Sequence, residues 1–128
     1  IKKSGSAMPK DSIDYILIYE ANAAGMPGSS TSIPESLTAA QDPCATLGAS
    51  GRCQMYTWNE VADTFNSAGT STWPETAINA CAGDPAATSV GVYMRSTHNM
   101  ITRLFFSTKA LSDRAVLSFE PLPKKDCK

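Results

Sequence analysis

The stretch SIDYILIYE, residues 12–20, limits the possible folds of this chain more than any other segment. In an extended strand, alternate side chains point to opposite faces of a sheet. One face then carries Ile13, Tyr15, Leu17 and Tyr19, and the other carries Asp14, Ile16, Ile18 and Glu20. Because β-branched and aromatic residues favour strands and both faces are largely apolar, the stretch predicts a central strand of a sheet.

Three further segments have a strand pattern. CQMYT at 53–57 predicts a short strand, and VGVYMRS at 90–96 alternates valine and methionine with glycine, tyrosine and arginine. DRAVLSFEP at 113–121 alternates in the same way and ends at Pro121, which has no backbone N–H to donate. The sequence therefore predicts an antiparallel β-sheet of about four strands.

The pattern S/T-x-x-E, typical of a helix capping box, occurs three times, at Ser32–Glu35, Thr57–Glu60 and Thr72–Glu75. In this motif the hydroxyl accepts from the N–H of the third residue, and the Glu side chain accepts from the N–H of the cap. Pro34 and Pro74 fit the first turn of a helix, where no backbone donor is needed. These signals predict short helices near 33–40, 58–66 and 73–81.

The stretch HNMITRLFFSTKAL, residues 98–111, begins with His98, the single histidine of the chain. Its apolar side chains follow the i, i+1, i+4, i+5 spacing of one helical face, at Met100, Ile101, Leu104 and Phe105. The spacing predicts a short amphipathic core helix between two strands. Each large side chain that it buries on the sheet contributes about 1.5–3 kcal/mol.

With 128 residues and 42% apolar composition, the chain predicts a single globular domain over residues 12–128. The polar start, residues 1–11, has no periodicity and is interpreted as a linker or an expression remnant. Strands and helices together predict an α+β fold, in which short α-helices face the antiparallel sheet.

The chain has an even number of cysteines without a C-x-x-C pair, at Cys44, Cys53, Cys81 and Cys127. This spacing argues against a zinc site and favours two disulfides, which form in an oxidising compartment outside the cytoplasm. Our hypothesis pairs Cys44 with Cys53 across a Gly-containing ring and Cys81 with Cys127. The loop-entropy model gives about 3 kcal/mol for the small ring and about 4 kcal/mol for the large one.

A formal net charge of −1 without a basic face argues against nucleic-acid binding. No apolar run reaches the roughly 18 residues that a membrane-spanning helix needs, and no signal peptide opens the chain. Cysteines of a secreted pattern without an export signal suggest that an upstream segment has been removed.

Candidate catalytic groups are sparse. His98 could serve as a general base, but no nucleophile motif such as G-x-S-x-G accompanies it, so a structural histidine is favoured. Glu60 and Glu75 are interpreted as capping residues rather than a glycosidase pair. The aromatic residues that could line a ligand surface, although we favour a core role, are Tyr56, Trp58 and Trp73. We expect no catalytic, cofactor-binding or metal-binding residues.

A longer segment, SVGVYMRSTHNMITRLFFSTKALSDRAVLSFEPLP at 89–123, resembles the C-terminal signature of TadE-like proteins of bacterial tight-adherence pili. In that family a valine-rich strand leads through an aromatic or histidine turn to an ITxLF helix and a strand ending in Glu-Pro. IDYILIYEANAAG at 13–25 and GRCQMYTWNEV at 51–61 are similar to two earlier segments of the same family. The three segments follow the family order.

The resemblance implies a pilin-like globular head of a minor pilin or pseudopilin, with neither enzymatic activity nor a cofactor. It implies a hydrophobic helix, not contained in this chain, that anchors the full-length protein in a membrane. It also implies other pilus subunits as partners, with loops 22–32, 44–53 and 66–72 free to contact them. Cys127 is not expected from the family pattern.

Three functions are compatible with these observations. The first is a structural role in pilus assembly and surface attachment, through protein–protein contacts outside the cytoplasm. The second is a secreted ligand-binding or adhesin module that uses the Trp- and loop-rich middle region, and the third is a small secreted hydrolase.

Overall fold

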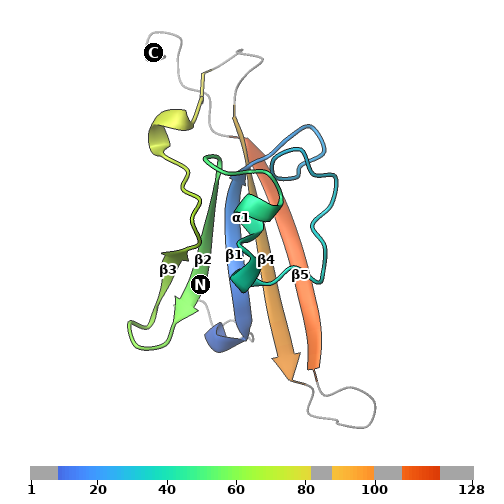
Figure 1. The fold of residues 1–128 in the computed structure, drawn as a ribbon, viewed down its shortest axis with the longest axis vertical. Coiled ribbons are helices and arrows are strands. Elements are labelled where there is room, and N and C mark those ends of the chain that lie inside the picture. The colour runs from blue at the N-terminus through green and yellow to red at the C-terminus, as the bar shows by residue number, and fades with distance from the viewer. Residues whose placement is uncertain (1–8, 82–87, 100–107, 119–128) are drawn as a thin grey trace.

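The computed structural model describes residues 9–81, 88–99 and 108–118. The described chain forms a five-stranded antiparallel sheet in the order β3-β2-β1-β4-β5 (Figure 1). Its strands are β1 Ile13–Glu20, β2 Cys53–Asn59, β3 Thr64–Ala68, β4 Ser89–Asn99 and β5 Thr108–Ser118. Helical structure in the described ranges consists of α1 Pro43–Thr46 and the single 3-10 turns η1 Lys10–Ser12, η2 Ala39–Gln41 and η3 Glu75–Ala77.

The stretch at 12–20 forms the central strand, as predicted. β1 pairs with β2 on one side and with β4 on the other, so that Leu17 lies between Met55 and Tyr93. Its burial alternates strictly, with every odd-numbered residue buried and every even-numbered residue half-buried. The period-two pattern in the sequence therefore corresponds directly to the two faces of the sheet.

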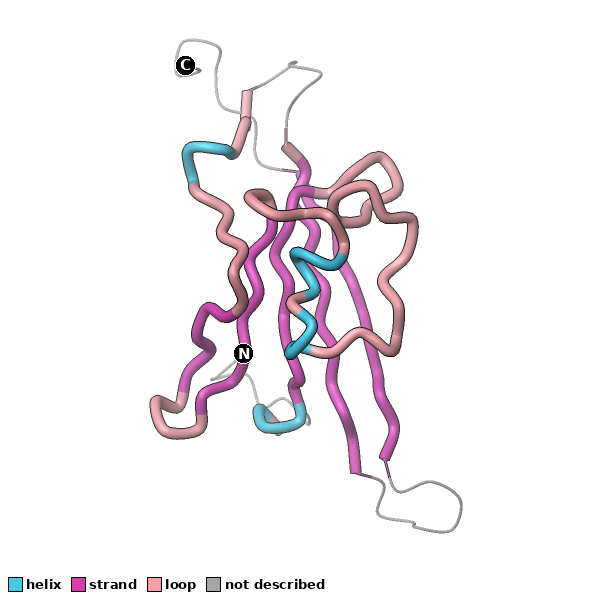
Figure 2. Tube along the Cα trace, viewed as in Figure 1, coloured by secondary structure: helices cyan, strands magenta, loops and turns pink. Residues whose placement is uncertain are grey.

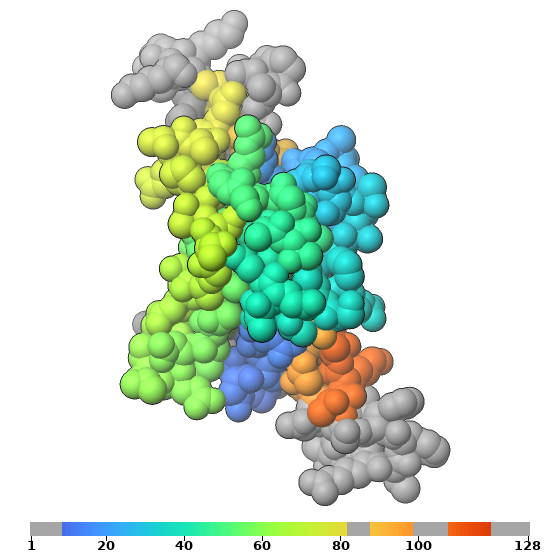
Figure 3. All heavy atoms as spheres, viewed as in Figure 1, coloured from blue at the N-terminus to red at the C-terminus, as the bar shows by residue number. Residues whose placement is uncertain are grey.

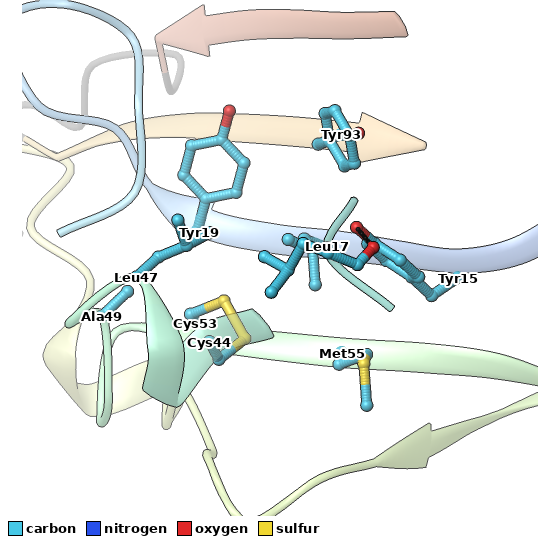
Figure 4. Packing of buried hydrophobic residues seen from close by; sticks show 10 residues of the cluster. Tyr15, Leu17, Tyr19, Cys44, Leu47, Ala49, Cys53, Met55 and Tyr93 are labelled. Carbon is cyan, nitrogen blue, oxygen red and sulfur yellow. Dashed lines mark hydrogen bonds between the residues drawn. A yellow bond between two sulfur atoms is a disulfide. The ribbon is translucent and has the colours of Figure 1, made fainter. Parts of the chain in front are cut away.

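One face, which we call the covered face, holds the core. Loops and α1 from the long connection between β1 and β2 lie over it (Figures 1 and 2). The core cluster beneath them includes the side chains of Tyr15, Leu17 and Tyr19, which are fully buried (Figure 4). The covering loop accepts hydrogen bonds from two of these side chains. The Tyr15 hydroxyl donates to the Leu37 carbonyl at 3.0 Å, and the Tyr19 hydroxyl donates to the Gly25 carbonyl at 3.1 Å.

The disulfide Cys44–Cys53 ties α1 to the start of β2, with 5.5 Å between the two Cα atoms, and confirms the predicted small ring. Both cysteines are fully buried in the core (Figure 4). Cys81 is also disulfide-bonded. Cys127, the predicted partner of Cys81, lies outside the described residues.

The helix predicted at 58–66 is wrong. β2 continues to Asn59, a turn follows, and β3 returns alongside it, pairing Trp58 with Phe65. The two rings meet edge to face, with centroids 5.1 Å apart. Trp58 continues the alternation of Gln54 and Tyr56 past residue 57, and the β preference of the two aromatic residues overrides the local capping signal at Thr57–Glu60.

The helices predicted at 33–40 and 73–81 are wrong as well, because each region contributes only a single 3-10 turn, η2 and η3. A capping box does form, but at Thr38 and Gln41, where each side chain bonds the other residue's backbone. Both predicted helices are short, and helices of that length are marginal unless tertiary packing supports them. The fold is therefore mostly β, and not α+β with several helices.

The last two strands are longer than predicted. β4 runs on to Asn99, and β5 begins at Thr108, where it pairs with Asn99. His98 consequently lies within β4 opposite Lys109, and not at a junction between strand and helix. The predicted core helix with Met100, Ile101, Leu104 and Phe105 lies outside the described residues, as do residues 119–121 of the predicted last strand.

Candidate functional site

A cleft opens on the covered face between the β1–β2 loop and the last two strands. Its volume is about 270 Å³, and it is lined by Met26, Ser32, Ile33, Tyr93, Ser112, Asp113 and Arg114. A smaller hollow bounded by Glu35, Arg95 and Ala110 shares Tyr93 and Ser112 with it. Together these form a groove, the β5 groove, whose walls are the loop at 26–35 and the strand β5. The space-filling view shows the loop standing over this face of the sheet (Figure 3).

The loop wall of the groove is held in place by Asn22. Its amide nitrogen donates to the carbonyls of Gly28 at 3.0 Å and Ser30 at 2.9 Å. Its amide oxygen accepts from the N–H groups of Ala24 and Met26. Gly28 has a φ of +59°, and a Cβ there would lie 2.7 Å from the Gly48 carbonyl oxygen. Only glycine allows this close approach of two loops, so the wall has a defined shape.

Arg95 holds the lower part of the loop to the sheet. Its Nη1 donates to the Leu37 carbonyl at 2.6 Å and to the Glu35 carbonyl. Its Nε lies 3.3 Å from Asp14, whose carboxylate also accepts from Thr97 at 2.8 Å. Asp14 can reach Arg95 because the register between β1 and β4 shifts between Ile13 and Tyr15. Arg95 is thus a structural cation that fastens the loop.

Arg114 fastens the upper part of the loop from β5. Its Nη1 donates to the Gly25 carbonyl at 3.2 Å and lies 3.1 Å from the Met26 sulfur. Within the described ranges, all of its hydrogen bonds come from Nη1, which leaves Nε and Nη2 without a partner. Arg114 therefore presents remaining guanidinium donors at the rim of the groove.

Tyr93 forms the floor of the groove. The residue is only 5% exposed, yet within the described residues its hydroxyl oxygen has no hydrogen-bond partner that satisfies the geometry. Its ring packs at 5.9 Å from that of Tyr15 (Figure 4). This hydroxyl adjoins that of Tyr15, whose pKa it influences. A ligand group that opened the floor of the groove could give it a well-aligned hydrogen bond, which a buried hydroxyl favours.

Burial dominates the electrostatics of the tyrosine cluster. It raises the pKa of Tyr15 to about 12, with the neighbouring Tyr93 adding to the effect and Arg95 opposing it. Burial also raises the pKa of Tyr19, against the influence of Arg114. Both phenols therefore remain neutral hydrogen-bond donors over the physiological range.

The residues considered for catalysis do not converge. Glu60 lies in the turn between β2 and β3, and Glu75 begins η3, which is at the opposite end of the sheet (Figure 1). His98 lies on β4. Among the described residues, no group of three His, Cys, Asp or Glu side chains could hold a metal ion.

The second face of the sheet, which we call the open face, is apolar too. Its described large apolar side chains are Ile16, Ile18, Tyr56, Trp58, Phe65, Val90, Val92, Met94, Leu111 and Leu117. All are half-buried except the two leucines of β5, Leu111 and Leu117, which are exposed. The described chain places no layer over them comparable to the loops of the covered face. At one end Lys10 stands 5.1 Å from the centre of the Trp58 ring.

Side chains on this face form continuous rows across the strands. Ile16 lies between Tyr56 and Met94, and Ile18 lies between Gln54 and Val92. A solvent-facing antiparallel sheet normally alternates apolar and polar residues. The open face is therefore a second candidate site, for a macromolecular partner rather than a small ligand.

The sequence predicted aromatic candidates at Tyr56, Trp58 and Trp73. The first two share the open face, whereas Trp73 is half-buried in the segment before η3. The groove residues Tyr93, Arg95 and Arg114 were missed. The alternation of VGVYMRS did place Tyr93 and Arg95 on one face, but the loop that makes a groove above them has no sequence period.

No helix in the described ranges is long and apolar enough to span a membrane. The disulfide is typical of a protein from an oxidising, extracytoplasmic environment. No family model, curated protein or solved structure matches this chain.

Proposed function

We propose that this chain is the extracytoplasmic head of a TadE-like minor pilin or pseudopilin, with a structural role in the assembly of a tight-adherence pilus and in surface attachment. It acts by protein–protein contact and carries no catalytic machinery. Its full-length form is anchored in the membrane by a hydrophobic helix outside this chain, and its partners are other pilus subunits.

The observation that carries the proposal is the open face. An antiparallel sheet that is apolar on both faces needs a layer on each, because every half-exposed Ile, Val or Trp leaves apolar surface in water. The covered face has its layer in the described chain. The open face, with Ile16, Ile18 and Val92 at its centre, fits a partner surface.

The disulfide and the family resemblance support the same function. A buried Cys44–Cys53 bond suits a domain that folds after export. The resemblance covers the strands β1, β2, β4 and β5, which make up most of the open face.

A photo-crosslinking experiment tests the proposal. A photoreactive side chain replaces Val92 on the open face of the full-length protein, in its native cells. The matched control places it at Val61, which is fully exposed in the β2–β3 turn. We expect Val92 to crosslink to another pilus subunit and Val61 to do so far less. Equal crosslinking from both positions, or none from Val92 in a folded protein, would contradict the proposal.

The β5 groove supports a second candidate function, a ligand-binding or adhesin module. Its specific observation is the buried Tyr93 hydroxyl without a partner at the floor of the 270 Å³ cleft. If this second function is correct, substitutions in the groove abolish ligand binding and substitutions on the open face do not.

A further inference from the structure

β5 is an edge strand of unusual length and exposure. It lies at the end of the sheet order and spans Thr108–Ser118, with every residue exposed. The strand at the other edge, β3, covers only Thr64–Ala68. Edge strands are usually protected by shortness, by proline, by charged side chains or by a covering element. β5 contains no proline, and no described segment pairs with its outer side. Its charged residues Lys109, Asp113 and Arg114 flank an uncharged stretch at 110–112.

The hydrogen-bonding pattern identifies which backbone groups of β5 point outward. The backbone N–H of Ala21 donates to the carbonyl of Ser89, which lies opposite it just beyond the end of β1. Hydrogen-bonded pairs recur at every second residue of an antiparallel ladder, so the odd-numbered residues of β1 and β4 bond to each other. The even-numbered residues of β4 must then bond to β5, where their partners are odd-numbered. The N–H and C=O groups of the even-numbered β5 residues, such as Ala110 and Ser112, consequently face away from the sheet.

An independent contact supports this assignment. The Arg114 N–H is not used in the ladder and instead donates to the carboxylate of Asp113 at 2.7 Å. Asp113 therefore caps one outward donor and protects that point of the edge. The outward N–H groups of Ala110 and Ser112 have no such cap among the described residues.

The β5 groove runs beside these free backbone groups. Ser112 lines both of its hollows, and Tyr93 lies on its floor with the unpartnered hydroxyl. Arg114 supplies guanidinium donors at its rim. A tyrosine hydroxyl beside an arginine fits a carboxylate, which accepts from both.

We propose that the outer edge of β5 at Ala110–Ser112 receives an extended strand of a partner protein, one of whose side chains places a carboxylate between Tyr93 and Arg114. Main-chain hydrogen bonds to the edge supply the affinity, and the carboxylate supplies the selectivity. This surface is separate from the open face, so the inference does not rest on the proposed function.

The test titrates the intact chain with a short alternating threonine–valine peptide that ends in lysines and has one central glutamate. A second peptide carries glutamine instead. NMR amide shifts locate the binding site and give the affinity. We expect the amides of Ala110 and Ser112 to shift most, and the glutamine peptide to bind about tenfold more weakly, the effect of losing one charge-assisted contact.

Two pairs of variants separate the backbone contribution from that of the carboxylate. Ser112→Pro removes one outward N–H without removing a ladder bond, and Ser112→Ala keeps that N–H. We expect the proline variant to bind about tenfold more weakly than the alanine variant. Tyr93→Phe removes only the hydroxyl and should abolish the preference for glutamate, whereas Tyr56→Phe on the open face should preserve it. The two phenylalanine variants keep the test valid if Ser112→Pro does not fold.

Several outcomes would overturn the inference. One is the absence of shifts in β5 at millimolar peptide, and another is equal binding by the two Ser112 variants. Self-association through β5 without peptide binding would assign the edge to a second copy of this chain. A fourth outcome is that acetate shifts the NMR signals of Tyr93 to saturation and leaves those of the β5 amides unchanged. The groove would then be a site for small carboxylates and not for a strand.

Discussion

Gly91 on β4 lies directly against the ring of Tyr19 on β1, so closely that a Cβ at position 91 would overlap ring atoms Cε2 and Cζ. The two residues are cross-strand partners. Tyr19 is fully buried, and its hydroxyl is bonded to the Gly25 carbonyl. The ring therefore cannot move aside without breaking that bond and disturbing the loop above it.

We expect Gly91→Ala to destabilise the protein by about 1–3 kcal/mol through overpacking. Urea unfolding followed by tryptophan fluorescence measures the change. Tyr19→Leu removes most of the ring, so in that background the same Gly91→Ala substitution should cost clearly less. An equal cost in both backgrounds would show that the contact between Gly91 and Tyr19 is not responsible.

Loss of the Cys44–Cys53 disulfide should also be costly. The bond closes a short ring between α1 and β2, and its removal frees the unfolded chain. We expect Cys44→Ala/Cys53→Ala to lower the free energy of unfolding by about 3 kcal/mol. Equilibrium unfolding without reductant measures this, because the disulfide of Cys81 stays intact under those conditions. A change below about 1 kcal/mol would indicate that the ring is already restricted in the unfolded state.

Stability should fall at alkaline pH because of Tyr15. Burial raises its pKa from 10.0 to about 12, so the unfolded chain loses this proton first as the pH rises. The stabilisation is complete below pH 10 and is lost as the pH passes through the folded-state pKa. The total effect is about 2–3 kcal/mol. Urea unfolding at pH 9 and pH 11 measures the loss, and Tyr15→Phe should reduce it. An unchanged pH dependence in that variant would contradict the prediction.

Asp42 should stabilise the protein above acidic pH. Its carboxylate accepts from the backbone N–H and the hydroxyl of Thr70, both at 2.7 Å, and these bonds lower the pKa of Asp42. The contribution is present above the unfolded-state pKa and is lost as the pH falls through the lower folded-state pKa.

We expect Asp42→Asn to cost about 1 kcal/mol at pH 7 and less near pH 2, where the carboxyl group of the parent is neutral as well. Thermal unfolding across this pH range measures the difference between the two proteins. Thr70→Val is the matched control, because it removes only the hydroxyl donor and should cost less than Asp42→Asn at pH 7. Asparagine tolerates the left-handed backbone at position 42, where φ is +44°, as well as aspartate does. A pH-independent difference would therefore assign the cost to the changed hydrogen-bonding pattern of the amide rather than to charge.

The period-two stretches were the most reliable part of the sequence. The alternation in SIDYILIYE predicted both the central position of β1 and its two apolar faces, because burial in a sheet follows side-chain direction. The short Gly-containing interval between Cys44 and Cys53 likewise predicted their pairing, since ring closure is local.

The errors came from signals that act over a few residues. Thr57 and Glu60 satisfy a capping pattern, but Trp58 is held in a strand by Phe65, a partner that no local motif specifies. The β5 groove was beyond prediction for a similar reason. Arg114 reaches the Gly25 carbonyl only because the β1–β2 loop folds back over the sheet, and Asn22 and Gly28 set that path by tertiary contacts.

The strand order places the earliest strand of the chain at the centre of the finished sheet. Ile16 pairs with Tyr56 on one side and must wait for Met94, much later in the sequence, on the other. A chain made from its amino terminus therefore leaves one hydrogen-bonding edge of β1 unpaired until β4 is complete, so closure of the sheet is a late, long-range step of folding. Until that step, the unpaired edge of β1 is open to wrong pairing and aggregation.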